Sequence, residues 1–377
     1  MLDPQAASRA AFWIAGVVAL ALGLLVSGFR WEDFPLGHYE ASAPLPRTAH
    51  NASVERAVFA QDRLWLLTSA GEVWTVSKNA PAPSRIAIPE PAAELCADGD
   101  TVVAVTTPAG SPMTYTVRRR VGLDWQAIAA VPSRNEGLVG VQCPADGVVL
   151  VTAQRLVDLR PGGGRSLALS HRIPSAHVNV LHLTPTHVFV GVNAGEWGGG
   201  LHRIDRRTGQ VAFLERNAHG DLCGGPLNGG CDPVNGLAER PGKPGCIVAA
   251  VGLVHMRQRG QLVEVCGEQI ELLYRQPCPR AWDPDGSVDK HGEPFCTIAF
   301  FGLGRRGDAL LAMGVDGLHV IEGGSAHNRG VPKFQAYGPF RVSFDLPEAV
   351  LVLTDVNRRT SLSGMTPLMA MRPPGTL

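Results

Sequence analysis

The sequence has no excess of charge of either sign, because 34 Lys and Arg residues balance 34 Asp and Glu residues. A domain that binds nucleic acid normally shows a basic excess or a basic stripe, so nucleic acid is not an expected partner. Aromatic residues make up only 6% of the chain, which argues against an aromatic stacking surface. Lysine is scarce as well, with four residues, whereas alanine, glycine and proline are abundant. That composition is typical of a GC-rich bacterial gene.

Motifs that would indicate an enzyme are missing. No Cys-x-x-Cys pair occurs, which disfavours zinc ribbons and thioredoxin-like chemistry, and no Cys-x-x-Cys-His occurs for covalent haem. A Gly-x-Ser-x-Gly elbow is absent, as are the phosphate-loop and dinucleotide fingerprints. The sequence therefore names no catalytic residue, and a binding protein is the favoured function. A metal-assisted hydrolase or lyase is the alternative.

One long apolar run is present, at residues 10–29, and it contains no charged residue. Arg9 and Arg30 bracket its 20 residues, which is the length that an α-helix needs to cross a bilayer. Arg9 before the run, and Glu32 and Asp33 after it, favour an N-terminus in the cytoplasm. We expect a single-pass signal anchor in the bacterial inner membrane, with residues 1–9 in the cytoplasm and the rest of the chain in the periplasm.

The alternative for this run is a cleaved signal peptide, because Val26 and Gly28 are small enough for a cleavage site. Apolar regions of signal peptides usually span only ~7–15 residues, so an uncleaved anchor is favoured. Ala15, Ala19 and Gly23 recur every four residues and offer a small face for packing against other membrane helices. The predicted binding function therefore includes that of a subunit in a larger membrane complex.

All eight cysteines follow the apolar run, and an even number on the exported side predicts disulfides. Position suggests four pairs without fixing the connectivity. Two cysteines flank a predicted hairpin centred near residue 256, two pairs enclose loops, and two cysteines precede equivalent strand-like runs. In that order the pairs are Cys246 with Cys266, Cys223 with Cys231, Cys278 with Cys296, and Cys96 with Cys143.

Strand-like apolar runs recur along the chain. They begin at residues 64, 102, 148, 188, 247, 310 and 350, so four of the six intervals measure 38 to 46 residues. A four-stranded blade of a β-propeller occupies ~40–45 residues. Turn signals such as Asp146-Gly147 and Asp316-Gly317 separate the runs, and a second run follows most of them at hairpin distance. The regular period favours a propeller over a sandwich, which has no reason to repeat in this way.

Two stretches resemble known propeller blades. Residues 313–321 read Met-Gly-Val-Asp-Gly-Leu-His-Val-Ile and are similar to the Gly-Leu turn of sensor-type regulator propellers. Residues 193–209 end in Asp-Arg-Arg-Thr-Gly and resemble a blade of the seven-bladed propeller superfamily, in which a hairpin ends in Asp-x-x-Thr-Gly. The resemblance covers roughly residues 52–372 and implies an all-β, seven-bladed β-propeller. Six blades are the alternative, since residues 357–371 lack a clean second strand.

The predicted organisation is a cytoplasmic N-terminus (1–9), a transmembrane signal-anchor helix (10–29), a linker (30–50), the propeller (51–372) and a tail (373–377). The end of the linker is expected to supply a strand that closes the ring. Two intervals are overlong because they contain insertions, roughly at 217–234 and 276–296, each with one close cysteine pair. Long loops usually persist because they are functional. We therefore expect one rim to carry both insertions and to bind a partner protein or a small ligand.

Polar side chains surround the glycine-rich turns of residues 193–235, and they suggest a pocket at the mouth of the propeller. Carboxylate and amide oxygens in such a pocket would also suit calcium. The alternative is structural, with the glycines permitting a tight hairpin and the charged residues solvating it. The candidate residues for binding a ligand or partner are Asn193, Glu196, Trp197, His202, His219, Asp221, Asp232 and Asn235.

Asp283, Asp285 and Asp289 form a second cluster, and three carboxylates at this spacing resemble a calcium-binding loop. An EF-hand requires Gly at its sixth position and Glu at its twelfth, whereas here Gly286 is fourth and Pro294 is twelfth. The loop is therefore not an EF-hand, and a solvated turn competes with a calcium site. The sequence predicts no cofactor, with calcium as the alternative. Four histidines lie close in sequence without a pattern that fixes a metal: His171, His177, His182 and His187.

Overall fold

The computed structural model describes residues 39–41, 54–77, 80–108, 114–218, 220–221, 223–255, 257–330, 341–347, 349–353 and 368–371. The predicted anchor at residues 10–29 and the candidate residue His219 lie outside that part of the chain. Within it, no helix has the length and hydropathy that crossing a membrane requires. The chain divides into two units, Met1–Gly37 and His38–Leu377, and every described element belongs to the second.

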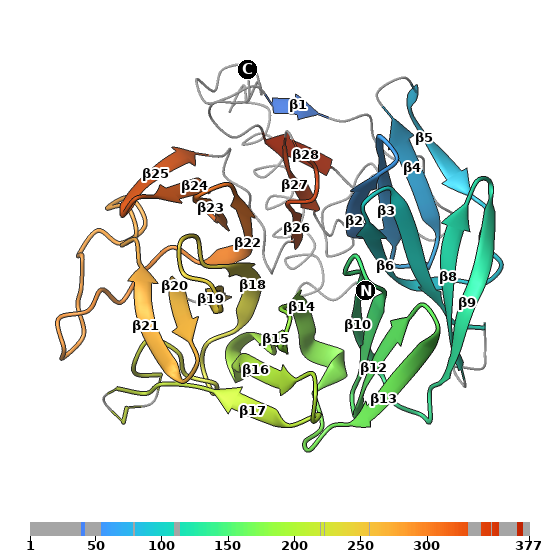
Figure 1. The fold of residues 1–377 in the computed structure, drawn as a ribbon. Coiled ribbons are helices and arrows are strands. Elements are labelled where there is room, and N and C mark those ends of the chain that lie inside the picture. The colour runs from blue at the N-terminus through green and yellow to red at the C-terminus, as the bar shows by residue number, and fades with distance from the viewer. Residues whose placement is uncertain are drawn as a thin grey trace, which may run out of the picture. The chain divides into compact units, whose positions relative to one another are not determined.

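The described strands form seven four-stranded antiparallel sheets (Figure 1). Sheet 1 contains β2 (Val54–Ala60), β3 (Arg63–Thr68), β4 (Val73–Ser77) and β5 (Ala80–Ile86). Sheet 2 contains β6 (Ala92–Asp98), β7 (Thr101–Thr106), β8 (Thr114–Val121) and β9 (Asp124–Pro132). Sheet 3 contains β10 (Leu138–Gln142), β11 (Val148–Thr152), β12 (Arg155–Arg160) and β13 (Gly163–Ala168). The 3-10 helix η2 (Ser175–His177) follows sheet 3.

Sheet 4 contains β14 (Val178–Leu183), β15 (His187–Asn193), β16 (Gly199–Asp205) and β17 (Val211–Leu214), with the 3-10 helix η3 (Gly195–Trp197) between β15 and β16. Sheet 5 contains β18 (Val234–Glu239), β19 (Cys246–His255), β20 (Arg257–Cys266) and β21 (Gln269–Tyr274). Sheet 6 contains β22 (Phe300–Arg306), β23 (Ala309–Gly314), β24 (Gly317–Glu322) and β25 (Ser325–Gly330). Sheet 7 contains β26 (Arg341–Ser343), β27 (Val350–Leu353), β28 (Leu368–Met371) and β1 (Tyr39–Ala41).

The sheets form a closed ring through contacts between their innermost strands. β2 contacts β6, β6 contacts β10, and the series continues through β14, β18, β22 and β26 back to β2. At the closing contact, Ser343 Oγ donates to the Ala57 carbonyl oxygen at 2.9 Å, and Arg341 Nη1 donates to the Glu55 carbonyl oxygen at 3.0 Å. Four-stranded sheets arranged radially define a β-propeller, so the predicted all-β propeller is confirmed.

Sheet 7 combines segments from both ends of the chain. β1 comes from the predicted linker and pairs antiparallel with β28, with Tyr39 opposite Met371. β28 pairs in turn with β27, and all four residues of β27 are buried. The linker therefore supplies the outermost strand of the closing sheet, as expected from the sequence. The other six sheets each use four consecutive strands.

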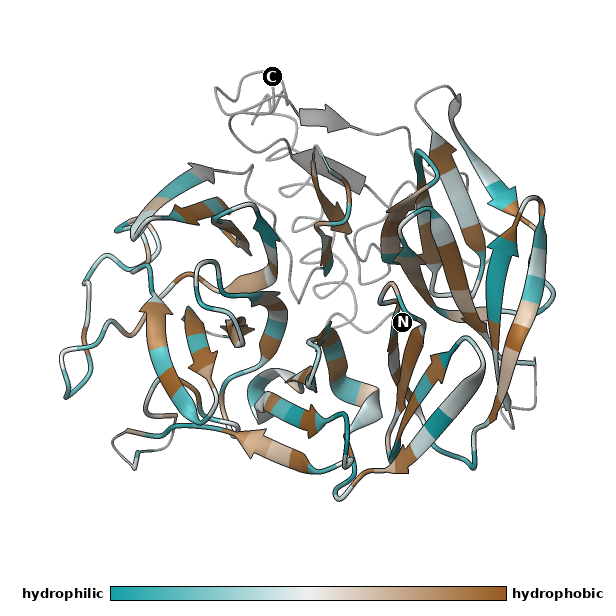
Figure 2. Ribbon diagram, viewed as in Figure 1, coloured by the Kyte–Doolittle hydropathy of each residue, from teal (hydrophilic) through white to brown (hydrophobic). Residues whose placement is uncertain are grey.

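The second strand of a sheet is buried on both faces, which explains the uninterrupted apolar runs in the sequence. All five residues of β11 are buried. Val148 and Leu150 pack with residues of sheet 2, whereas Val149 and Val151 pack with residues of sheet 4. Alternate side chains of one strand thus fill two different interfaces between sheets. Figure 2 shows hydrophobic residues concentrated on inner strands such as β2, β3 and β27.

The four disulfides have the pairing that position suggested, and no cysteine is free. Cys246 and Cys266 lie directly opposite each other across the β19–β20 pair. Cys96 of β6 is bonded to Cys143, the residue that follows β10, so this disulfide joins sheets 2 and 3 across 47 residues of chain. The other two disulfides, Cys223–Cys231 and Cys278–Cys296, each close one of the two insertions.

Candidate partner-binding face

Four connections lie on one side of the ring, because the second and fourth strands of each antiparallel sheet end on the same side. They are the β15–β16 connection with η3, the β19–β20 hairpin, the first insertion (217–234) and the second insertion (276–296). The first insertion leads from β17 to β18, and the second leads from β21 to β22. We call this side of the ring the insertion face.

The two insertions contact each other through Asp221. Its carboxylate lies 2.7 Å from Lys290 Nζ and 2.8 Å from His291 Nε2, so one acidic residue of the first insertion meets two basic residues of the second. The hydrogen bonds from Lys290 and then from His291 lower the pKa of Asp221. The sequence-predicted candidate Asp221 thus joins the insertions into one continuous surface, with exposed ion pairs that each add little stability.

Buried residues of the first insertion also attach it to the ring. Leu227 is fully buried in the core shared by sheets 4 and 5. Asp232 is fully buried as well, and its Oδ2 atom accepts a hydrogen bond from the Asn228 backbone N–H at 2.8 Å. Arg259 Nε of β20 lies 3.4 Å from Asp232 Oδ1. Burial, the largest cause, raises the pKa of Asp232 even though Arg259 and Asn228 oppose that shift.

The glycines of the β15–β16 connection permit a close approach to the first insertion. Gly198 has φ +88°, and a Cβ atom there would lie 2.5 Å from the Gly229 carbonyl oxygen. Gly199 N donates to the Gly229 oxygen at 3.0 Å, and Gly200 N donates to the Asp232 oxygen at 3.0 Å. Gly198, Gly199 and Gly200 therefore hold η3 against the first insertion. This is the structural role that the sequence analysis gave as the alternative to ligand binding.

Replacing Cys231 by serine is expected to loosen residues 217–234 and to leave the ring folded. Both ends of the Cys223–Cys231 disulfide lie in the insertion, and removing a short disulfide loop costs about 2–3 kcal/mol of mostly local stability. Hydrogen exchange should accelerate in the insertion while the global unfolding midpoint stays near that of the wild type. Cys278→Ser is the matched variant for the second insertion. Global unfolding of Cys231→Ser would show that the disulfide stabilises the whole ring and not the insertion alone.

Asn235 of β18 is buried and forms hydrogen bonds with residues of sheets 4, 5 and 6. Its amide nitrogen donates to the Gly252 oxygen at 2.8 Å and to the Phe300 oxygen at 2.9 Å. Its amide oxygen accepts from Asn179 Nδ2 at 3.1 Å and from Asn193 Nδ2 at 2.6 Å. An asparagine amide has two donor hydrogens and two acceptor positions, so all its hydrogen-bonding capacity is used within the protein. Two of the predicted candidates, Asn193 and Asn235, are thus brought together.

The most exposed aromatic residue on the insertion face is Trp197 of η3, with 81% of its surface exposed. The carboxylate of the adjacent Glu196 lies 2.9 Å from His255 Nε2, and this polar contact links η3 to the end of the β19–β20 hairpin beside the exposed Val254. Val288 and Phe295 of the second insertion are also exposed hydrophobic residues. The face therefore presents apolar side chains on connections that ion pairs and disulfides hold in place.

The three aspartates of the predicted calcium loop are not brought into one cluster. Asp289 Oδ1 accepts hydrogen bonds from the His291 N–H at 2.8 Å and the Glu293 N–H at 2.9 Å, which stabilises a turn. No group of three His, Cys, Asp or Glu residues that would hold a metal ion occurs in the described ranges, which include Asp283 and Asp285. The calcium hypothesis stays a prediction, and a rise of the unfolding midpoint on titration with calcium would support it.

Of the four histidines that lie close in sequence, His182 and His187 lie on sheet 4, whereas His177 ends η2 and His171 precedes it. Burial lowers the pKa values of His182 and His202, and burial followed by the charge of Arg203 lowers that of His187. His202 packs against Phe213 with ring centroids 5.1 Å apart. His182, His187 and His202 are therefore packing residues of the β14–β17 sheet.

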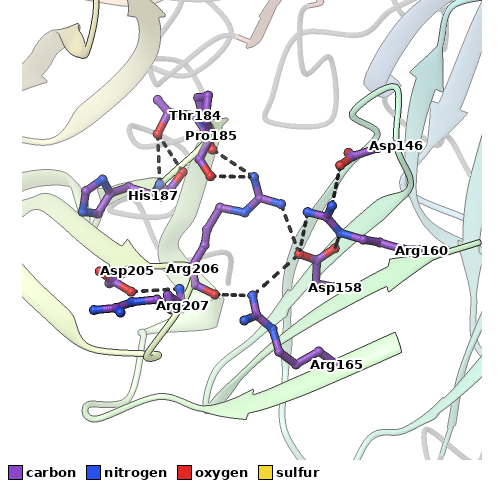
Figure 3. A network of polar contacts seen from close by, with 10 residues as sticks. All are labelled: Asp146, Asp158, Arg160, Arg165, Thr184, Pro185, His187, Asp205, Arg206 and Arg207. Atoms are coloured by element: carbon purple, nitrogen blue, oxygen red, sulfur yellow. Dashed lines mark hydrogen bonds and ion pairs between the residues drawn. The ribbon is translucent and has the colours of Figure 1, made fainter. Parts of the chain in front are cut away.

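A cluster of arginines around Asp158 was missed in the sequence (Figure 3). Asp158 of β12 is buried, and its carboxylate lies 3.2 Å from Arg160 Nε, 3.1 Å from Arg206 Nη2 and 3.9 Å from Arg165 Nη2. Arg206 also donates to the carbonyl oxygens of Thr184 and Pro185, so the cluster ties sheet 3 to sheet 4. It lies at the β14–β15 turn, on the side of the ring opposite the insertion face.

The ring of seven sheets and its connecting loops define a β-propeller. No protein-family model and no curated protein matches this chain. Among solved structures, the chain is similar to YCF48 from Cyanidioschyzon merolae, with 12% identity over 89% of this chain and 99% of that one, and a TM-score of 0.56. It is also similar to YCF48 bound to D1 peptide, with 12% identity over 92% and 98% of the two chains and a TM-score of 0.57.

A third similar structure is the extracellular domain of a putative hybrid two-component system from B. thetaiotaomicron. It has 13% identity and a TM-score of 0.50, and the match covers 89% of this chain but 40% of that one. These similarities support the β-propeller fold. They name no specific protein for this chain.

Proposed function

We propose that this chain is a membrane-anchored, extracytoplasmic, seven-bladed propeller that binds a partner protein on its insertion face. The observation that carries the proposal is Trp197, which is 81% exposed on a short helix held by the Glu196–His255 contact and by the first insertion. Exposed apolar side chains on monomeric proteins commonly mark interaction sites when they gather on one surface. Four disulfides and the fold shared with an extracellular domain support an extracytoplasmic location.

A protein partner is favoured over a small ligand by the chemistry of the face. Trp, Tyr and Arg residues dominate the binding energy of protein interfaces, and a ring of near-neutral contacts around them excludes water. Trp197 with Val254, and Val288 with Phe295, offer such anchors, while the surrounding Asp221, Lys290 and His291 are polar. The similar propeller YCF48 is known bound to D1 peptide, which supports peptide or protein binding by this architecture.

The binding proposal is tested by placing a photo-crosslinking amino acid at position 197 in cells that produce the full chain. We expect a discrete adduct with one partner, identified by mass spectrometry. The control position is Leu123, which is 87% exposed at the β8–β9 turn on the opposite side of the ring. With the partner purified, Trp197→Ala should weaken binding about 10- to 100-fold, and Leu123→Ala should leave it unchanged. Equal crosslinking from both positions, or full affinity of Trp197→Ala, would refute the site.

The membrane proposal makes a separate prediction. The full chain should resist extraction by alkaline carbonate, whereas a chain beginning at residue 31 and exported by a cleavable signal should be soluble in the periplasm, because residues 10–29 are long enough to span a bilayer. Thiol alkylation should label no cysteine before reduction and all eight after it, because every cysteine is in a disulfide. A mature N-terminus near residue 29 would contradict the anchor and leave the binding proposal intact.

A further inference from the structure

Arg120 is a buried arginine at the junction of sheets 1 and 2. It lies near the end of β8, and only 8% of its surface is exposed. In the β8–β9 pair it stands directly opposite Trp125, and its guanidinium carbon lies 5.4 Å from the centre of the Trp125 ring. Trp125 in turn packs edge-to-face against Trp65 of β3, with ring centroids 6.2 Å apart. The guanidinium of Arg120 therefore lies against the Trp125 ring, which packs in turn on Trp65 of the neighbouring sheet.

The donors at this junction lack acceptors. Arg120 Nη1 and Trp125 Nε1 are both buried, and neither has a hydrogen-bond partner among the residues that the structure describes. Buried polar groups in proteins are almost always hydrogen-bonded, so two adjacent buried donors without acceptors require an explanation. Trp65 shows the ordinary arrangement, because its Nε1 atom donates to the Ala60 carbonyl oxygen at 3.2 Å.

Arg118 shows how a neighbouring guanidinium group on the same strand is paired. Arg118, two residues earlier on the same strand face, lies 2.8 Å from Glu90 and also donates to Thr106. Among the described residues, Arg120 Nη1 has no hydrogen-bond partner, although the carboxylate of Asp124 acts on Arg120 through its charge. Burial is the largest effect on the pKa of Arg120 and lowers it, the negative charge of Asp124 raises it, and the positive charge of Arg63 lowers it. Asp124 and Arg63 therefore act in opposite directions, and the apolar surroundings strengthen the attraction of the unpaired guanidinium donor to an anion.

We propose that this junction binds one small anion, a halide or a carboxylate, held by Arg120 Nη1 and Trp125 Nε1. The charge of the anion neutralises Arg120 inside the protein, and its lone pairs accept both unpaired hydrogens. Arginine and indole N–H groups are donors only, so the ligand must be an acceptor. Arg119 also has a buried Nε atom without a partner, but its side chain points to the opposite face of β8, in register with Val103. Arg119 is therefore outside the proposed site.

The proposal is tested on the purified full-length protein in detergent. Sodium gluconate is replaced stepwise by sodium chloride, bromide or acetate at constant ionic strength, so that screening of surface charges stays equal. An anion that binds only the folded state should raise the unfolding midpoint by about 2–4 °C and then saturate. A response to halides alone assigns a spherical anion, and a response to acetate alone assigns a carboxylate. In crystals soaked in bromide, an anomalous peak is expected between Arg120 and Trp125.

Variants separate this site from general salt effects. Arg120→Met should abolish the anion dependence whatever its own stability, and Trp125→Phe should shift the dependence to about tenfold higher concentration because one hydrogen bond to the anion is lost. Arg119→Met, on the opposite face of the same strand, should respond like the wild type. An unfolding midpoint that is the same in gluconate, chloride, bromide and acetate would overturn the proposal. An equal anion response of Arg120→Met and the wild type would also overturn it.

Discussion

Replacing Asn235 by leucine is expected to destabilise the propeller by at least about 4 kcal/mol, which is enough to unfold many domains. The substitution keeps the volume of the side chain but removes two donors and two acceptor positions from a buried site. It would leave the Gly252 and Phe300 carbonyl oxygens, and the amide groups of Asn179 and Asn193, without their partner. Each buried group left unpaired costs about 1–3 kcal/mol.

The measurement is denaturant unfolding of the full chain, with Asn328→Leu as the control. Asn328 is exposed and donates one hydrogen bond, to Asp316 at 2.6 Å, so its loss should cost less than about 1 kcal/mol. The result also separates the two functions considered for Asn235. If Asn235→Leu unfolds at the same denaturant concentration as the wild type but fails to bind the partner, Asn235 is a binding residue. Its structural role in linking the three sheets is then wrong.

Glu136→Gln is the second substitution with a large expected effect, about 3–5 kcal/mol of destabilisation. Glu136 and Arg155 are both almost fully buried, and Arg155 Nε lies 3.0 Å from each carboxylate oxygen of Glu136. Thr152 donates a further hydrogen bond to the same carboxylate. Neutralising Glu136 leaves the Arg155 charge buried without a counterion, and that is more costly than losing the pair as a whole.

A double variant and an exposed pair test this explanation. Glu136→Leu combined with Arg155→Met should be more stable than Glu136→Gln alone, because no buried charge is left unpaired. Glu239 and Arg305 form an ion pair of similar length, 2.9 Å, but both side chains are substantially exposed. Glu239→Gln should therefore cost less than about 1 kcal/mol. Urea unfolding of the four proteins gives the comparison, and equal losses for Glu136→Gln and Glu239→Gln would show that burial does not matter here.

The same arrangement recurs in the preceding sheet, where Glu90 accepts from Thr106 at 2.6 Å and from Arg118 at 2.8 Å. In both sheets the glutamate precedes the innermost strand and the threonine ends the second strand. The partner arginine lies on the third strand. This repeated pairing was not recognised in the sequence, because the glutamate and the threonine are 16 residues apart and the arginine varies in position.

Features set by neighbouring residues were predictable. The apolar run at residues 148–151 became a strand buried on both faces, and the Asp205-to-Gly209 motif became a turn. In that turn, Asp205 Oδ1 accepts the backbone N–H groups of Arg207 and Thr208 at 2.8 Å each. The cysteine pairs were predictable for a similar reason, because each pair either encloses a loop or occupies equivalent places in adjacent repeats.

Features set by distant residues were not predictable. Asn235 appeared in the sequence as a loop residue with a possible ligand, whereas one of its acceptors lies 65 residues further along the chain. Asp158 looked like an ordinary polar position of a strand, and its partner Arg206 is 48 residues away. Arg120 was one of three consecutive arginines, and nothing in that run shows which guanidinium is paired.

By itself, the sequence predicted the strands, their repetition, a closing strand from the linker and a set of cysteine pairs whose connectivity it left open, because apolar runs, turns and cysteine spacing act over a few residues or one repeat. Only the tertiary structure decided which polar side chains meet. Charges and amides find partners across the interfaces between sheets, and the closure of the ring, rather than local preference, brings those surfaces together.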